Sequence, residues 1–160
     1  MSTSIDHTTL TAIKQHLESA YPLEACGFLL GSEVNRKRWI TKAIPVENIS
    51  TENQKRRFMI NPLDYLKIER KALEEGQALL GIYHSHPDHP AIPSVHDLEF
   101  AQPFFSYFIL SIEKGSLTNT RSYRLFDGKF IEEKFVVHHE LQNHNAINHK
   151  SKMVSKNPKS

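Results

Sequence analysis

Residues 78–97 of the chain read ALLGIYHSHPDHPAIPSVHD. The first six of them, 78–83, form a nearly continuous apolar run, which is typical of a strand buried on both faces of a sheet. This run leads directly into His84. Because alternate side chains of a strand project from the same face, His84 and His86 present two imidazoles side by side. The stretch therefore predicts a buried strand that ends in a pair of histidines.

A carboxylate follows this pair at a short distance along the chain. Ser94 is a good cap for a short helix through about residue 102, and Asp97 lies in its first turn, close enough to fold back toward the histidines. Two imidazole nitrogens and one carboxylate oxygen leave the fourth tetrahedral position to water, as in catalytic zinc sites. Zinc lowers the pKa of such a water to roughly 7. We therefore predict one Zn²⁺ per chain on His84, His86 and Asp97, with a bound water as the nucleophile.

A hydrolytic zinc site also needs a proton acceptor that is not a ligand. Glu24 is the candidate, because it follows a helical segment and precedes the short apolar run 26–31, so it can lie at the edge of the same sheet. The hydroxyl of Ser94 can donate to a developing oxyanion while it caps its helix. Plain capping remains an alternative for Ser94. His89 and His96 lie between these positions and are expected at the rim of the site.

The rest of the chain alternates helical and strand patterns. We expect an α/β fold in which one mixed sheet is flanked by helices. Asp6 or Thr8 can cap the first helix, and Asn61-Pro62 begins the second. In that second helix, Leu66 and Leu73 are expected to join the buried stripe. The predicted helices are 7–20, 62–75 and 95–102, and the predicted strands are 26–31, 37–46, 58–60, 78–83, 105–110, 121–126 and 129–137.

Length and composition fit one domain, which we place at residues 1–137. Residues 138–160 have little apolar content and no periodicity, so we expect a polar, disordered tail. The chain has 39% apolar and 24% charged residues with a net charge of +2, which gives no case for a nucleic-acid or membrane partner. No apolar run approaches the ~18 residues of a membrane span. The start resembles no secretory signal, and Cys26 is the single cysteine, so we expect a cytoplasmic protein in which this thiol is buried and inert.

The spacing of the polar positions resembles a known family, the JAMM (MPN+) metalloproteases. The resemblance covers about residues 8–137, and segments 57–62 (RFMINP) and 84–90 (HSHPDHP) are similar to its small bacterial branch. Its motif is long, gapped and complete. The residues that carry it are Glu24, Cys26-Gly27, Leu30-Gly31 and then His84-x-His86-Pro87-x6-Ser94-x2-Asp97.

The resemblance implies a single MPN-type domain with zinc on His84, His86 and Asp97, Glu24 as acid and base, and Ser94 as oxyanion donor. It also implies hydrolysis after the C-terminal Gly-Gly of a ubiquitin-like or β-grasp sulfur-carrier protein of the ThiS/MoaD kind. We expect an extended substrate tail to add along a sheet edge beside the metal. Two alternatives remain: a non-catalytic scaffold of this fold, and a zinc hydrolase of a small molecule. The bond type (peptide, isopeptide or cysteine adduct), the carrier and the oligomeric state stay open.

Overall fold

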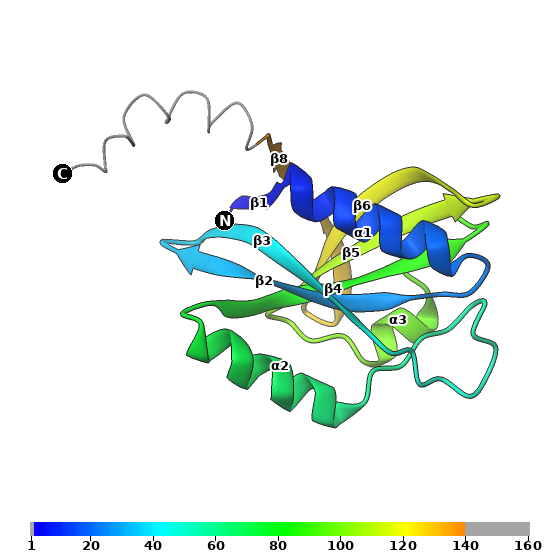
Figure 1. Ribbon diagram of the computed structural model, residues 1–160, viewed down its shortest axis with the longest axis horizontal. Coiled ribbons are helices and arrows are strands. Elements are labelled where there is room, and N and C mark those ends of the chain that lie inside the picture. Colours follow the sequence, from blue (N-terminus) through cyan, green and yellow to red (C-terminus); the bar gives the residue numbers. More distant parts are fainter. Residues whose placement is uncertain (1, 140–160) are drawn as a thin grey trace.

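Strand β4 (Ala78–Pro87) lies inside an eight-stranded mixed sheet in the computed structural model, which describes residues 2–139 (Figure 1). It pairs antiparallel with β2 (Cys26–Val34) and parallel with β5 (Ser106–Glu113). The predicted α/β fold is confirmed. The strand order is β7-β6-β5-β4-β2-β3-β1-β8, and the remaining strands are β1 (Ser2–Asp6), β3 (Lys37–Val46), β6 (Ser116–Phe126), β7 (Lys129–Glu133) and β8 (Val136–His138).

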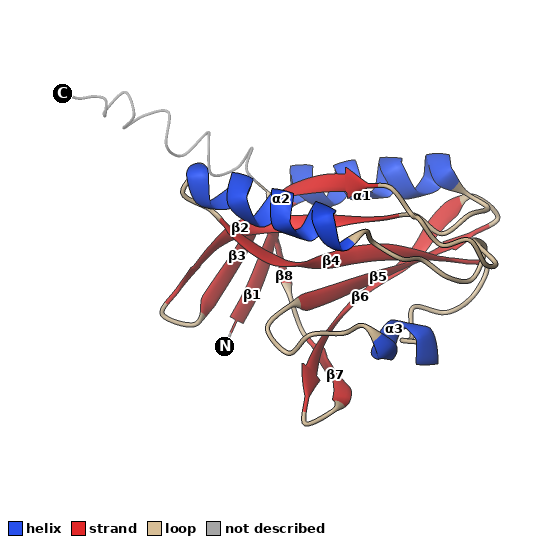
Figure 2. Ribbon diagram, turned by 90° about the horizontal axis from the view of Figure 1, so that it is seen from below, coloured by secondary structure: helices blue, strands red, loops and turns tan. Residues whose placement is uncertain are grey.

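Helices cover both faces of this sheet (Figures 1 and 2). Helix α1 (His7–Ala20) has the bounds that its periodicity predicts, and it buries Ile13 and Leu17. Helix α2 (Pro62–Glu74) begins after Asn61, whose side chain accepts a hydrogen bond from the Leu63 N–H, as expected of a cap. The short helix α3 (Val95–Glu99) lies between β4 and β5 in the chain.

The apolar side chains of the central strands divide between two cores. In β2, Leu29 packs with α1, whereas Phe28 and Leu30 pack with α2. In β4, Leu80 belongs to the core beneath α1 and Ile82 to the core beneath α2. A strand buried on both faces explains why residues 78–83 are continuously apolar rather than alternating. Within residues 2–139, no helix is long and apolar enough to cross a membrane.

Several expected strands differ in the structure. Residues 58–60 are extended but form no strand, because their backbone bonding is confined to Met59, which pairs with the Ile49 N–H and the Asn48 side chain. The predicted strand 129–137 is two strands, β7 and β8. Strand β8 leaves the hairpin and pairs in parallel with β1, a strand that the polar N-terminal sequence did not predict. Non-local pairing of this kind leaves no periodic signal in the sequence.

Other local predictions also need correction. Asp6 precedes α1 but its carboxylate makes no cap; instead it accepts a hydrogen bond from the Trp39 indole at 2.6 Å. Leu66 and Leu73 are 60% and 78% exposed, so the buried stripe of α2 is narrower than expected. The sheet extends through His138, one residue past the predicted domain boundary. The rest of the predicted tail, 140–160, lies outside the described residues.

Candidate metal centre and active site

The pairing of β2 with β4 positions Glu24 beside the histidines. Cys26 is the register partner of His84 in this antiparallel pair, so continuing the register by two residues sets Glu24 opposite His86. The Ser85 N–H donates to the Ala25 carbonyl at 3.1 Å, which holds the two segments together beyond the last paired residues of β2 and β4. Residues that are sixty positions apart in sequence are therefore neighbours at one end of the sheet.

The three predicted ligands converge on one point. The Nε2 atoms of His84 and His86 lie 3.2 Å apart. The two carboxylate oxygens of Asp97 lie 3.3 Å from His84 Nε2 and 3.1 Å from His86 Nε2. For bonds of about 2.0–2.1 Å, ligand atoms at the corners of a tetrahedron are about 3.3–3.4 Å apart. The two Asp97 contacts are made by different oxygens, but each of these distances is close to that spacing, so the three side chains are near enough to hold one small metal ion.

The hydrogen bonds of His86 leave its Nε2 free to act as a ligand. His86 Nδ1 lies 2.8 Å from the Pro90 carbonyl oxygen, which can only accept, so Nδ1 carries the hydrogen and Nε2 carries the lone pair. Such an outer contact fixes the tautomer and the orientation of a metal-binding imidazole. The ring of His84 is held by the Phe58 ring, which stacks on it with the centroids 4.4 Å apart.

Asp97 is oriented by the start of its own helix. The Ser94 hydroxyl accepts from the Asp97 N–H at 3.1 Å, and the Asp97 carboxylate accepts from the Ser94 N–H at 2.8 Å, which together form a capping box. The predicted cap at Ser94 is confirmed. The box directs the Asp97 carboxylate back toward the histidines, and the Ser94 O–H hydrogen remains available to a further acceptor.

Burial and neighbouring charges shift the pKa values of Asp97 and Glu24 in opposite directions. Burial alone would raise the pKa of Asp97, but the adjacent imidazoles of His84 and His86 outweigh it and hold this pKa well below its usual range. Glu24 is 3% exposed, and its Oε1 has no hydrogen-bond partner among the described residues. Burial, together with the charge of Asp97, raises the pKa of Glu24 to about 8. One carboxylate is thus kept ionised while the other is able to hold a proton.

The raised pKa of Glu24 predicts a pH-dependent stability of the metal-free protein. The native state keeps a proton on Glu24 up to about pH 8, whereas the unfolded chain releases it near 4.5. Stability from this group is therefore complete below pH 4.5 and is lost as the pH rises toward 8. We expect the Tm of metal-free Glu24→Gln to exceed that of the wild type at pH 8 but not at pH 5. The Tm values are measured by thermal unfolding. The same difference in Tm between variant and wild type at pH 5 and pH 8 would contradict a raised pKa of Glu24.

A second group of potential ligands, Glu24, His86 and His89, shares one histidine with the first. The rings of His86 and His89 are stacked, with centroids 4.1 Å apart and planes only 18° from parallel. Lone pairs in the planes of stacked rings run side by side and do not converge on one ion. The group of His84, His86 and Asp97 is therefore the better metal site, and His89 flanks it.

Asn48 is a neighbour of Glu24 that the sequence did not single out. Its side-chain amide donates to the carbonyls of Glu24 and Arg57 at 3.1 and 3.0 Å, and its oxygen accepts from the N–H groups of Ser50 and Met59. These four bonds join the backbone of Glu24 to the loop opposite. An asparagine in a polar loop carries no sequence signal for such a role.

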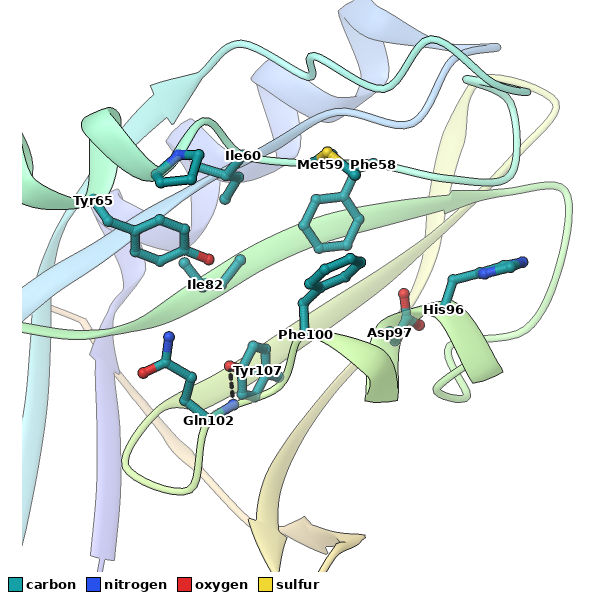
Figure 3. A pocket seen from close by; sticks show the side chains of 11 residues that line it. Phe58, Met59, Ile60, Tyr65, Ile82, His96, Asp97, Phe100, Gln102 and Tyr107 are labelled. Atoms are coloured by element: carbon teal, nitrogen blue, oxygen red, sulfur yellow. Dashed lines mark hydrogen bonds between the residues drawn. The ribbon is translucent and has the colours of Figure 1, made fainter.

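A groove of about 290 Å³ leads away from Asp97 (Figure 3). Its floor is formed by Ile82 of β4 and Tyr107 of β5, and its walls are aromatic and apolar. Within residues 2–139, β4 is paired on both sides, so it offers no free edge of the kind expected beside the predicted ligands. The other lining side chains are Phe58, Met59, Ile60, Pro62, Tyr65, His96, Phe100 and Gln102.

Cys26 is next to this site in the fold but takes no part in it. Its side chain is fully buried, and burial raises the pKa of its thiol to about 12. A thiol with so high a pKa is neither a nucleophile nor a ready metal ligand near neutral pH. The structure thus agrees with the expectation of a buried, inert cysteine.

Comparisons with known proteins give a consistent family. The family of prokaryotic homologs of the JAB domain matches residues 7–126. A CysO-cysteine peptidase of Mycobacterium tuberculosis is 30% identical over 78% of this chain and 83% of its own. A probable TtuB-protein conjugate cleaving protease of Thermus thermophilus is 32% identical over 65% of this chain and 66% of its own.

Solved structures agree with this assignment. A protein of Desulfitobacterium hafniense superposes with a TM-score of 0.77 at 28% identity, covering 89% of this chain and 97% of that one. A JAB1/MPN domain protein of Archaeoglobus fulgidus has a TM-score of 0.58 at 21% identity, over 86% of this chain and 98% of that one, and shows the shared fold. The chain therefore belongs to the prokaryotic branch of the JAB/MPN domain family.

Proposed function

We propose that the chain is a JAMM-type zinc metallopeptidase that hydrolyses the bond after the C-terminal Gly-Gly of a ubiquitin-like or sulfur-carrier protein. The observation that carries the proposal is the convergence of His84, His86 and Asp97 at tetrahedral spacing beside the buried Glu24. The named relatives support the peptidase activity and this class of substrate, because they include a CysO-cysteine peptidase and a TtuB-conjugate protease.

In this proposal His84, His86 and Asp97 hold the zinc ion. When bound, zinc lowers the pKa of a water to about 7 and polarises the carbonyl under attack. Glu24 accepts a proton from the attacking water and passes it to the departing amine; it is buried opposite His86, and its Oε1 has no hydrogen-bond partner within residues 2–139. Ser94 donates its free O–H to the oxyanion that develops on the carbonyl.

The shape of the site supports an extended substrate tail. The groove beside Asp97 is lined mainly by apolar and aromatic side chains, so it can hold a C-terminal segment outside the body of a globular carrier. Glycine next to the scissile bond fits a crowded centre, because it has no side chain to clash with the buried ligands. The tail then enters from the groove side, and the leaving amine lies toward Glu24.

The test is the cleavage of a ThiS/MoaD-like carrier that is extended by a few residues beyond its Gly-Gly. We expect the zinc-loaded protein to remove the extension, measured as a loss of intact mass ending at the second glycine. A chelator should stop the reaction, and re-addition of zinc should restore it. An intact carrier after incubation with protein that carries stoichiometric zinc would contradict this substrate class.

A further inference from the structure

Two neighbouring cations beside the candidate active site, Lys55 and Arg56, make no ion pair or side-chain hydrogen bond within residues 2–139. Lys55, Arg56 and Arg57 are consecutive in the loop that faces Glu24. Arg57 forms an ion pair with Glu52. Arg56 is exposed, and within residues 2–139 its guanidinium makes neither a hydrogen bond nor an ion pair. The charge of Arg56 is therefore free to bind a ligand.

The loop holds Arg56 against the Glu24 side of the site. The Glu24 N–H donates to the Gln54 carbonyl at 2.7 Å, and Asn48 bridges the carbonyls of Glu24 and Arg57. Arg56 lies between these two anchors. Its positive charge lies close enough to act on both Glu24 and His89, although burial is the larger influence on each. The groove that begins at Asp97 is lined by none of Arg56, Glu24 and His89. In the proposed function Arg56 therefore lies outside the path of the carrier tail.

We propose that Arg56 binds a carboxylate on the leaving group, namely the free α-carboxylate of a single amino acid joined through its amine to the terminal glycine of the carrier. The inference rests on the proposed function, in which Glu24 protonates the departing amine. In that reaction the amide C–N bond breaks, the carbonyl carbon gains the hydroxyl of water, and the nitrogen gains a proton through Glu24.

The position of the carboxylate on the leaving group distinguishes a bond to a single amino acid from an isopeptide bond to a lysine side chain. An α-carboxylate is one carbon away from the departing nitrogen, so it emerges beside Glu24, where a guanidinium can bind it with two parallel hydrogen bonds. The ε-amine of a lysine inside a target protein has no carboxylate at this distance. A carrier that ends in one additional amino acid therefore fits this surface better than an isopeptide conjugate.

The experiment compares three carriers that differ only after the Gly-Gly: one residue with a free carboxylate, the same residue as its amide, and an isopeptide to lysine. We expect the wild type to prefer the free acid over the amide by roughly 10- to 100-fold in kcat/KM, the range of a charge-assisted hydrogen bond. In Arg56→Gln this ratio should fall to near one. The matched control is Lys55→Gln, which removes the neighbouring exposed charge and should keep the ratio.

The ratio separates recognition from other effects of the substitution. A change in the protonation of Glu24, in zinc content or in folding slows the acid and the amide alike and leaves their ratio unchanged. Equal rates on both substrates in the wild type, or an unchanged ratio in Arg56→Gln, would overturn the role of Arg56 while the peptidase function stands. Cleavage of none of the three carriers by zinc-loaded wild type would instead overturn the proposed function.

Discussion

Glu24→Gln should retain one zinc ion per chain and lose nearly all turnover. The amide has almost the shape of the carboxyl group, so the backbone contacts to Gln54 and Asn48 and the packing around residue 24 persist. It cannot accept a proton from water, however, and general acid–base groups contribute about 10²- to 10⁴-fold to rate. We expect kcat to fall by this factor, with little change in KM.

The measurement is the initial rate of carrier cleavage at matched zinc content, determined by elemental analysis. Glu47→Gln is the matched control, since it removes an exposed carboxylate in the neighbouring loop and should leave the rate unchanged. A near-normal rate in Glu24→Gln would remove Glu24 from its proposed role. Loss of zinc in this variant would instead make it part of the ligand set.

His84→Ala and Asp97→Ala should each lose stoichiometric zinc. Removing one of three protein ligands leaves two donors, too few to hold the ion against dialysis. Asp97→Asn is a useful companion variant, because a neutral amide oxygen can still accept the Ser94 N–H of the capping box while the negative charge beside the histidines is gone. A loss of zinc in Asp97→Asn would then result from the missing carboxylate charge and not from a disrupted helix cap.

His89→Ala is the control for this pair of variants. Its ring stacks parallel to that of His86 and does not belong to the group of His84, His86 and Asp97, so zinc should remain close to one per chain. Zinc content after dialysis, measured by elemental analysis, checks both statements. Full retention of tightly bound zinc in His84→Ala and Asp97→Ala, or its loss in His89→Ala alone, would show that the ligand set is wrong.

Local sequence rules were sufficient for the metal-binding geometry. The two-residue spacing of His84 and His86 at the end of an apolar strand predicts that their rings share a face, and their Nε2 atoms lie 3.2 Å apart. The spacing of Ser94 and Asp97 predicts a helix cap, and the reciprocal bonds of that cap also orient the carboxylate. In both cases the chemistry depends on contacts over a few residues, which the sequence displays directly.

Long-range pairing accounts for what could not be predicted. The position of Glu24 opposite His86 depends on the register of β2 against β4, which no periodicity reveals. The same holds for the parallel pairing of β1 with β8. Asn48 binds the backbone of Glu24 through an amide that would look the same in any loop. The support of Glu24 is thus a property of the assembled fold.

The most direct test of the account is a zinc titration of carrier cleavage. Metal-stripped protein would be given increasing zinc, and the initial rate of removal of residues beyond the Gly-Gly would be followed by intact mass. We expect no activity without metal and a rate that rises linearly to a plateau at one zinc per chain, in the wild type but not in Glu24→Gln. Full activity in metal-free protein, or a rate independent of bound zinc, would contradict this expectation.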